Sequence, residues 1–227
     1  MTIPTIEIDF VSDVACPWCA VGLAALEQAA AQVAGVANVR VRFQPFELNP
    51  KMPPGGMDAG EYLTRKYGAT PEQQAATRRV QCERAAEAGF VMRAEGRGRI
   101  YNTFAAHRLL HWAALQDAAA GQAGQGKQRA LKMALLSAYF GQGLSPESPA
   151  VLLEAARLVG LDEEGAAALL ASDEFASEVR AQEDRNTQAG IDAVPTLIFN
   201  DEFLISGAQP AAVLEETLRQ IAGQLAG

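Results

Sequence analysis

The sequence contains few of the residues that bind metal ions or form disulfide scaffolds. Its 227 residues include three cysteines and two histidines. Three cysteines are too few for a disulfide-stabilised small domain, and a structural zinc site needs four ligands at a spacing that is not found here. His107 and His111 lie four residues apart, but the Glu of an H-E-x-x-H zinc motif is missing. We therefore predict no metal site.

Basic charge is also scarce. The chain has 19 Lys and Arg against 27 Asp and Glu, which gives a formal net charge of -8. Nucleic acids and anionic membranes bind basic surfaces, so this balance argues against both as partners. No run of about 18 apolar residues is present, which predicts that no helix spans a membrane. Residues 1–9 lack the basic and apolar segments of a secretory signal, so we expect a cytoplasmic protein.

The motif Cys16-Pro17-Trp18-Cys19 lies where a strand-like pattern gives way to a helix-like one. Residues 6–11 alternate apolar and charged side chains, as expected of a strand with one buried face. Residues 21–28 are rich in Ala and Leu at helical spacing. Free N–H groups and the helix dipole favour a thiolate at a helix N-terminus, so we expect Cys16 to be a reactive thiol.

The first 50 residues predict a βαβ unit with parallel strands. Strands are expected at 4–11 and 39–44, with a helix at 18–33 between them. Opposite charges at Glu7 and Asp9 on one strand and at Arg40 and Arg42 on the other would then lie close together. Such cross-strand pairs support the register of the two strands.

The middle of the chain is predicted to be helical and the tail to be ββα. After a proline- and glycine-rich loop at 46–57, start signals such as Thr70-Pro71 and stop signals such as Gly89 divide the middle into helices. The expected helices are 58–67, 71–88, 102 or 103 to 119, 127–140, 148–159, 162–170 and 172–189. The tail has expected strands at 194–199 and 203–206 and a helix at 210–223.

This order of elements predicts an α/β protein with a thioredoxin fold, βαβ…ββα, that carries a large all-helical insertion. Residues 1–50 and 190–227 would form the thioredoxin-like domain, and residues 51–189 the helical insertion domain. About half of the residues are apolar, which is enough for a full core in a chain of this length.

Several segments together resemble the FrnE-like branch of the DsbA superfamily of thiol–disulfide oxidoreductases. These segments are 12–19 (SDVACPWC), 46–50 (FELNP), 102–109 (NTFAAHRL), 138–140 (AYF), 190–196 (GIDAVPT) and 206–209 (SGAQ). The matches extend over essentially the whole chain, and their order is more specific than a lone C-x-x-C. The resemblance implies a protein-disulfide oxidoreductase or isomerase that exchanges disulfides with protein or small thiol substrates.

The same superfamily includes 2-hydroxychromene-2-carboxylate isomerases and kappa-class glutathione transferases. Those relatives typically carry a serine where Cys16 stands and lack the second cysteine, so the presence of Cys16 and Cys19 favours dithiol chemistry. Fold-level likeness alone does not decide the reaction. A glutathione-dependent isomerase or transferase, and a non-catalytic chaperone-like binding module, therefore stay open as alternatives.

The resemblance to this family implies that Cys16 is the nucleophile. Cys19, one turn further into the helix, would attack the mixed disulfide and release the substrate. Pro17 and Trp18, between the two cysteines, would tune the reduction potential.

The resemblance further implies substrate-binding residues beyond the motif. Val194-Pro195-Thr196 would form a cis-proline loop that faces the dithiol and exposes a strand edge to substrate. His107 belongs to a family-like segment and would help to line the cleft.

No organic cofactor or metal is expected, although glutathione or a reductase would serve as the thiol partner that resets the cycle. Cys82 lies in a predicted helix among charged neighbours, which indicates a half-buried structural thiol. The sequence is compatible with a dimer but does not decide the oligomeric state.

Overall fold

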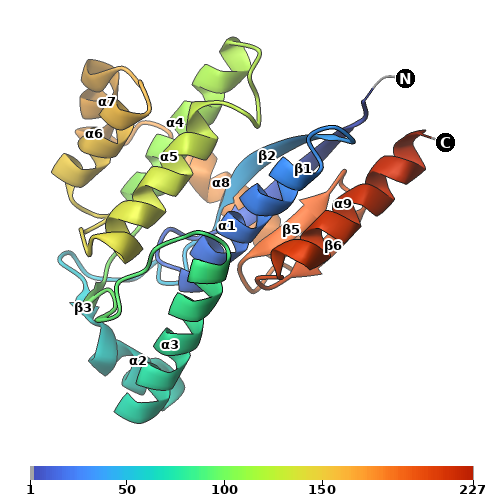
Figure 1. Ribbon diagram of the computed structural model, residues 1–227. Coiled ribbons are helices and arrows are strands. Elements are labelled where there is room, and N and C mark those ends of the chain that lie inside the picture. Colours follow the sequence, from blue (N-terminus) through green and yellow to red (C-terminus); the bar gives the residue numbers. More distant parts are fainter. Residues whose placement is uncertain (1–2, 227) are drawn as a thin grey trace.

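Strand β1 (Thr5–Ser12) lies inside a mixed sheet whose strand order is β2-β1-β5-β6 (Figure 1). The structure is a computed structural model that describes residues 3–226. Strand β2 (Asn38–Pro45) is parallel to β1, whereas β5 (Thr196–Phe199) is antiparallel to it and pairs with β6 (Phe203–Ser206). Helix α1 (Pro17–Gln32) connects β1 to β2, and α9 (Ala211–Ala226) follows β6. The predicted βαβ head and ββα tail are confirmed.

The register between β1 and β2 agrees with the predicted charge pairs. Glu7 lies opposite Arg40, and Asp9 lies opposite Arg42. The Arg42 guanidinium donates to both carboxylate oxygens of Asp9 at 2.9 Å, and an Arg40 nitrogen lies 3.4 Å from Glu7. These pairs are solvent-exposed, so each contributes little to stability, about 0–1 kcal/mol.

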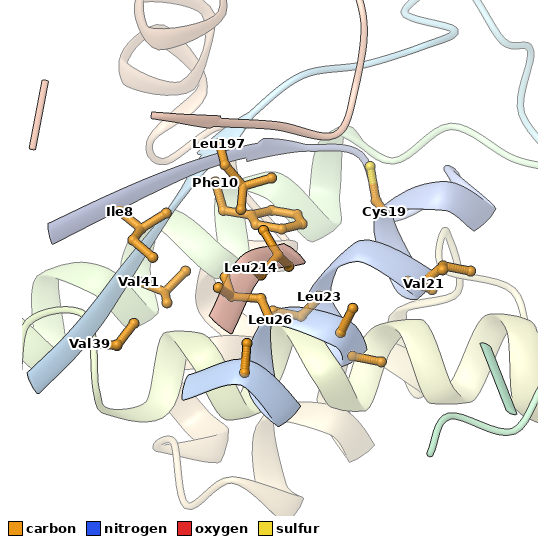
Figure 2. Close-up of a cluster of buried hydrophobic side chains, with 14 of the residues drawn as sticks. Ile8, Phe10, Cys19, Val21, Leu23, Leu26, Val39, Val41, Leu197 and Leu214 are labelled. Atoms are coloured by element: carbon orange, nitrogen blue, oxygen red, sulfur yellow. The ribbon is translucent and has the colours of Figure 1, made fainter. Parts of the chain in front are cut away.

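The alternate residues of β1 bury one face of the sheet against α1 and α9. Ile6, Ile8 and Phe10 are fully buried and share a cluster with Leu23 of α1 and Leu214 of α9. Figure 2 shows Ile8 and Phe10 above these helices, with Cys19 at the end of the same cluster. Cys19 is therefore part of the hydrophobic core of the sheet.

The insertion is helical, as predicted, apart from one small sheet. Its helices are α2 (Ala59–Tyr67), α3 (Pro71–Glu87), α4 (Phe104–Ala119), α5 (Lys127–Leu136), α6 (Pro149–Leu158), α7 (Glu163–Leu170) and α8 (Ala176–Gln188). The expectation of an all-helical insertion needs correction, because β3 (Met57–Asp58) pairs with β4 (Arg99–Ile100). The Arg99 side chain donates to the carbonyls of Gly55 and Gly56, which holds these two short segments together.

Two further helix boundaries differ from the prediction. The helix expected at 127–140 is α-helical only to Leu136 and continues as a π-helical segment, η1 (Ser137–Gly141). The helix expected at 172–189 begins at Ala176, because Phe175 has a left-handed backbone with φ 61°. The start signal at Thr70 is confirmed as a capping box with Gln73.

Two buried clusters lie under the helices. The larger one joins the sheet to residues of the insertion, among them Phe90, Leu136 and Tyr139. The smaller one is formed mainly by α4, α5, α6 and α7, with Leu109 and Leu131 fully buried. The first cluster crosses the predicted domain boundary, so the insertion packs directly on the sheet that carries the dithiol. No helix within residues 3–226 is long and apolar enough to cross a membrane.

Candidate active site

The two cysteines of the C-x-x-C motif occupy different positions at the start of α1. Cys16 is the N-cap residue, with an extended backbone, and Pro17 begins the helix. Proline suits this position because its missing N–H would have no partner inside the helix. Cys16 is 4% exposed and Cys19 is fully buried, and both are free thiols. Pro17 and Trp18 lie between them and are half-buried.

The environment moves the pKa values of the two thiols in opposite directions. A hydrogen bond from Cys19 lowers the pKa of Cys16, and the positive charge of Arg97 acts in the same direction. Burial raises the pKa of Cys19 well above its ordinary value. A thiolate is the nucleophilic form of cysteine, so the dithiol carries its more reactive sulfur at Cys16.

The loop before β5 brings Val194, Pro195 and Thr196 next to Cys16, although about 180 residues of chain separate them. The Val194–Pro195 peptide bond is cis. The Cys16 sulfur lies 3.6 Å from the carbonyl oxygen of Val194. Thr196 is buried and its hydroxyl donates to the Ala193 carbonyl at 2.9 Å, which fixes the loop.

Gly22 lets this loop approach α1 closely. A Cβ atom at Gly22 would lie 3.2 Å from the Pro195 ring, which is tighter than an ordinary van der Waals contact. The glycine is therefore required by close packing rather than by backbone conformation. It holds the proline loop against the helix that bears the dithiol.

Asp13, three residues before Cys16, is a buried carboxylate that the sequence analysis did not identify. Its oxygens accept hydrogen bonds from the backbone N–H groups of Ala15 at 3.0 Å and Leu48 at 2.7 Å. Burial alone would raise its pKa, but the neighbouring His107 and these two N–H groups lower it. Asp is a common turn-forming residue just before a helix, and this preference is the sequence signal that could have drawn attention to Asp13.

The structure places His107 beside Asp13. Its side chain is 2% exposed and its Nε2 lies 3.5 Å from the Asp13 carboxylate, and its role in lining the substrate cleft stays a prediction. It lines a chamber behind β2 together with Lys132, a fully buried residue of α5. His111 packs its ring 5.2 Å from that of Phe175. No local pattern indicates the burial of Lys132, because a lysine within a helix is normally a surface residue.

Arg97 comes from the loop between α3 and β4 and reaches the start of α1. Its guanidinium donates to the carbonyl of Ala15 at 2.5 Å and lies 6.0 Å from the centre of the Phe140 ring. Arg97 falls between the helices expected at 71–88 and from 102 or 103 to 119, where no local pattern indicates this contact. The structure places a positive charge of this loop near the Cys16 thiol.

The remaining cysteine, Cys82, lies on α3. Cys82 is half-buried, and its sulfur lies 3.8 Å from the carbonyl of Arg93. Within the described part of the chain, no three His, Cys, Asp or Glu side chains are grouped so that they could hold a metal ion.

Comparisons with known proteins agree with this geometry. The family model described as a DSBA-like thioredoxin domain matches residues 7–219. A structure described as a probable DsbA oxidoreductase from Streptomyces coelicolor has 33% sequence identity and a TM-score of 0.81, and the match covers 96% of this chain and 90% of that one. Comparison with curated proteins finds no match.

More distant structures share the fold. A 2-hydroxychromene-2-carboxylate isomerase has 15% identity and a TM-score of 0.65, with 97% of this chain and 98% of that chain covered. The cytosolic disulfide reductase DsbM from Pseudomonas aeruginosa, solved with GSH, has 18% identity and a TM-score of 0.58, with 94% and 99% covered. The family match over nearly the whole length shows that this chain belongs to the DsbA-like family of thiol–disulfide oxidoreductases.

Proposed function

We propose that this protein catalyses thiol–disulfide exchange, with Cys16 as the nucleophile and Cys19 as the resolving thiol. The observation that carries the proposal is that the pKa values of the two thiols are shifted in opposite directions. The pKa of Cys16 is lowered at the helix start, whereas burial raises the pKa of Cys19. A pair in which the first thiol ionises more readily than the second is suited to attack a disulfide first and to resolve the product second.

The reaction needs no organic cofactor or metal. The Cys16 thiolate attacks one sulfur of a substrate disulfide and releases the other as a thiolate. The Cys19 thiolate then attacks the Cys16 sulfur, so that an intramolecular disulfide forms and the second substrate sulfur leaves. The substrate is reduced by two electrons and the dithiol is oxidised. Glutathione or a protein reductase would return the enzyme to the dithiol form.

The residues around Cys16 would hold the substrate beside the sulfur. Val194 presents its carbonyl 3.6 Å from Cys16, so a substrate backbone N–H could bind at this edge. Pro195 and Thr196 shape the loop behind it, and Pro17 and Trp18 add apolar surface between the cysteines. His107, which lies beside Asp13, would help to line the cleft from behind this surface.

Cysteine replacements test this mechanism. Purified reduced protein is mixed with glutathione disulfide, and the species formed are followed by mass spectrometry. Cys16→Ser should abolish exchange, whereas Cys19→Ser should accumulate a mixed disulfide at Cys16. Cys82→Ser is the matched control and should exchange like the wild type. Normal turnover by Cys16→Ser would contradict the proposal.

A glutathione-dependent isomerase is the second candidate, and the fold shared with 2-hydroxychromene-2-carboxylate isomerase favours it. This alternative predicts turnover of a chromene-type substrate that saturates with glutathione and is insensitive to Cys19→Ser. A third, non-catalytic chaperone-like role predicts client binding that survives replacement of both cysteines.

The direction of electron flow follows from the reduction potential of the dithiol. A value of about -120 mV would identify an oxidant, and a value of about -270 mV a reductant. We propose a cytoplasmic location, in keeping with the cytosolic DsbM whose fold this chain shares. Cell fractionation tests this location.

A further inference from the structure

The chamber behind β2 has a volume of about 220 Å³, and neither Cys16 nor Cys19 lines it. β2 is an edge strand of the sheet, and α4, α5 and α8 pack beside it (Figure 1). The lining extends from exposed residues at the rim, such as Arg42 and Leu115, to the buried residues His107 and Lys132. The chamber is therefore open to solvent at one end and closed at the other.

Contacts along the edge of β2 build the walls of this chamber. The Gly124 carbonyl accepts a hydrogen bond from the Val41 N–H at 2.8 Å. The Gln128 side chain makes two hydrogen bonds to the backbone of Phe43, both at 3.2 Å. Gly124 has φ 75°, and a Cβ atom there would lie 2.9 Å from the Arg40 Cβ, so glycine is required at this position. The loop and α5 are thus attached to β2, and the space between them is part of the fold.

The closed end of the chamber contains two buried polar atoms without a hydrogen-bond partner. Lys132 has no exposed surface, and His107 is 3% exposed. Neither the Nζ of Lys132 nor the Nε2 of His107 has a hydrogen-bond partner among residues 3–226. Lysine is almost never fully buried without a partner, because removing an ammonium group from water is costly. Such atoms indicate a bound ion, ligand or water.

The lining of the chamber is basic, although the protein has a net charge of -8. None of the fifteen lining residues is Asp or Glu, and four of them can carry a positive charge: Arg42, His107, His111 and Lys132. Arg42 is already paired with Asp9, and the His107 Nε2 lies 3.5 Å from Asp13, which does not line the chamber. A negatively charged ligand would complement this lining and supply a partner for the Lys132 ammonium.

The rest of the lining is largely apolar. It includes Phe43, Pro45, Leu110, Ala114 and Leu115. A cavity of about 150 Å³ holds benzene, so a chamber of about 220 Å³ has room for a ring or a short chain that bears a carboxylate. Ligand sites combine an apolar lining with a few placed polar groups, and this chamber has that composition. A simple inorganic anion would leave the apolar walls uncovered.

We propose that the chamber is a second binding site, which takes a small monocarboxylate with an aromatic or short aliphatic body. The carboxylate pairs with the Lys132 ammonium at the closed end, because charge-assisted hydrogen bonds are the strong ones. The apolar body lies between Phe43 and Leu110 and points toward the rim at Leu115. This inference goes beyond the proposed exchange reaction and does not depend on it.

Calorimetric titration of the full chain with benzoate and with hexanoate tests the site. At least one of the two carboxylates should bind saturably, with one site per chain. The neutral analogues benzamide and hexanamide, and inorganic phosphate, should bind at least about tenfold more weakly. NMR signals of Phe43, Leu110 and His111 should shift when the ligand is added. Cys16→Ser should bind like the wild type, which separates this site from the exchange reaction.

Two variants locate the ligand. Lys132→Met keeps a side chain of similar length without the charge and should weaken binding by about tenfold or more. Lys127→Met, on the same helix, is the matched control, because Lys127 donates to the Gly160 carbonyl at the surface and does not line the chamber. Ala114→Leu fills the chamber without removing a charge, should also prevent binding, and carries the test should Lys132→Met fail to fold.

Four results would overturn the proposal. They are no saturable binding of either carboxylate, unchanged binding in Lys132→Met or Ala114→Leu, equal binding of the neutral analogues, and equal binding of inorganic phosphate. Equal binding of the neutral analogues would mean that Lys132 is not a partner of the ligand. Equal binding of phosphate would mean that the apolar walls do not contribute.

Discussion

The two halves of the helical insertion are built differently. The α2–α3 arm (residues 59–87) has no buried residue in α2 and only Ala85 in α3. The α4–α7 lobe (residues 104–170) has its own apolar cluster, with Leu109, Leu131 and Leu152 fully buried. Apolar packing therefore stabilises the helices of the lobe, whereas helix caps and side-chain hydrogen bonds contribute much of the stability of the helices in the arm.

The two halves of the insertion also place different charged residues near the dithiol. The loop that follows the arm supplies Arg97, a partly exposed charge that acts on Cys16. The lobe supplies Lys132, a fully buried charge that opposes the rise in the pKa of Cys19. Charges act more strongly in the interior than near water, so we expect the lobe to influence the chemistry more than the arm does. Each half of the insertion would thus adjust one of the two cysteines.

The largest expected effect is on the core of the lobe. Leu131→Ala removes a fully buried side chain and should lower the free energy of unfolding by about 2–5 kcal/mol, through lost burial and the cavity left behind. Denaturant unfolding measures this change. Leu158→Ala is the matched control, because Leu158 of α6 is 65% exposed and should matter little. Equal effects of the two substitutions would show that the lobe has no core of its own.

A smaller effect is expected at the cap of the arm. Thr70→Ala breaks the capping box with Gln73 and should lower the free energy of opening of α3 by about 1 kcal/mol. Hydrogen exchange of the α3 amides measures this local opening. Thr77→Ala, at an exposed position inside the same helix, should not lower it and should raise it by a few tenths of a kcal/mol, because Ala has the higher helix propensity. If protection in the lobe fell as much as in α3, the arm would not be an independent unit.

The smallest expected effect concerns Cys16. Arg97→Met removes the positive charge that helps to lower the pKa of this thiol, so its thiolate should form at higher pH. Alkylation of Cys16 near neutral pH should slow by less than about tenfold, the factor that one pKa unit represents. Peptide mass spectrometry separates Cys16 from the other thiols, and Arg79→Met in the exposed part of α3 is the control. Alkylation at the wild-type rate would show that Arg97 does not act on this thiol.

Part of the fold follows from local patterns. Alternating side chains predicted β1 and β2, and the opposite charges at Asp9 and Arg42 agreed with their register. Thr70-Pro71 predicted the start of α3, because a cap depends only on residues within one helical turn. The pair β3–β4 was missed, since two-residue strands carry no periodic pattern, and Arg99 holds them through contacts to a distant loop.

The sequence by itself determined where the two cysteines of the C-x-x-C motif lie in the fold. Cys16 and Cys19 are close along the chain, at the point where the strand-like pattern ends and the helix-like pattern begins. Cys16 therefore lies at the start of the helix and Cys19 within its first turn, so their environments differ. The family resemblance implied that Val194 faces the dithiol, whereas tertiary structure alone decided that Arg97 reaches the start of α1 and that Lys132 and Asp13 are buried in the interior. Local preferences act over a few residues, whereas the burial and the charge felt by a thiol depend on segments that only folding brings together.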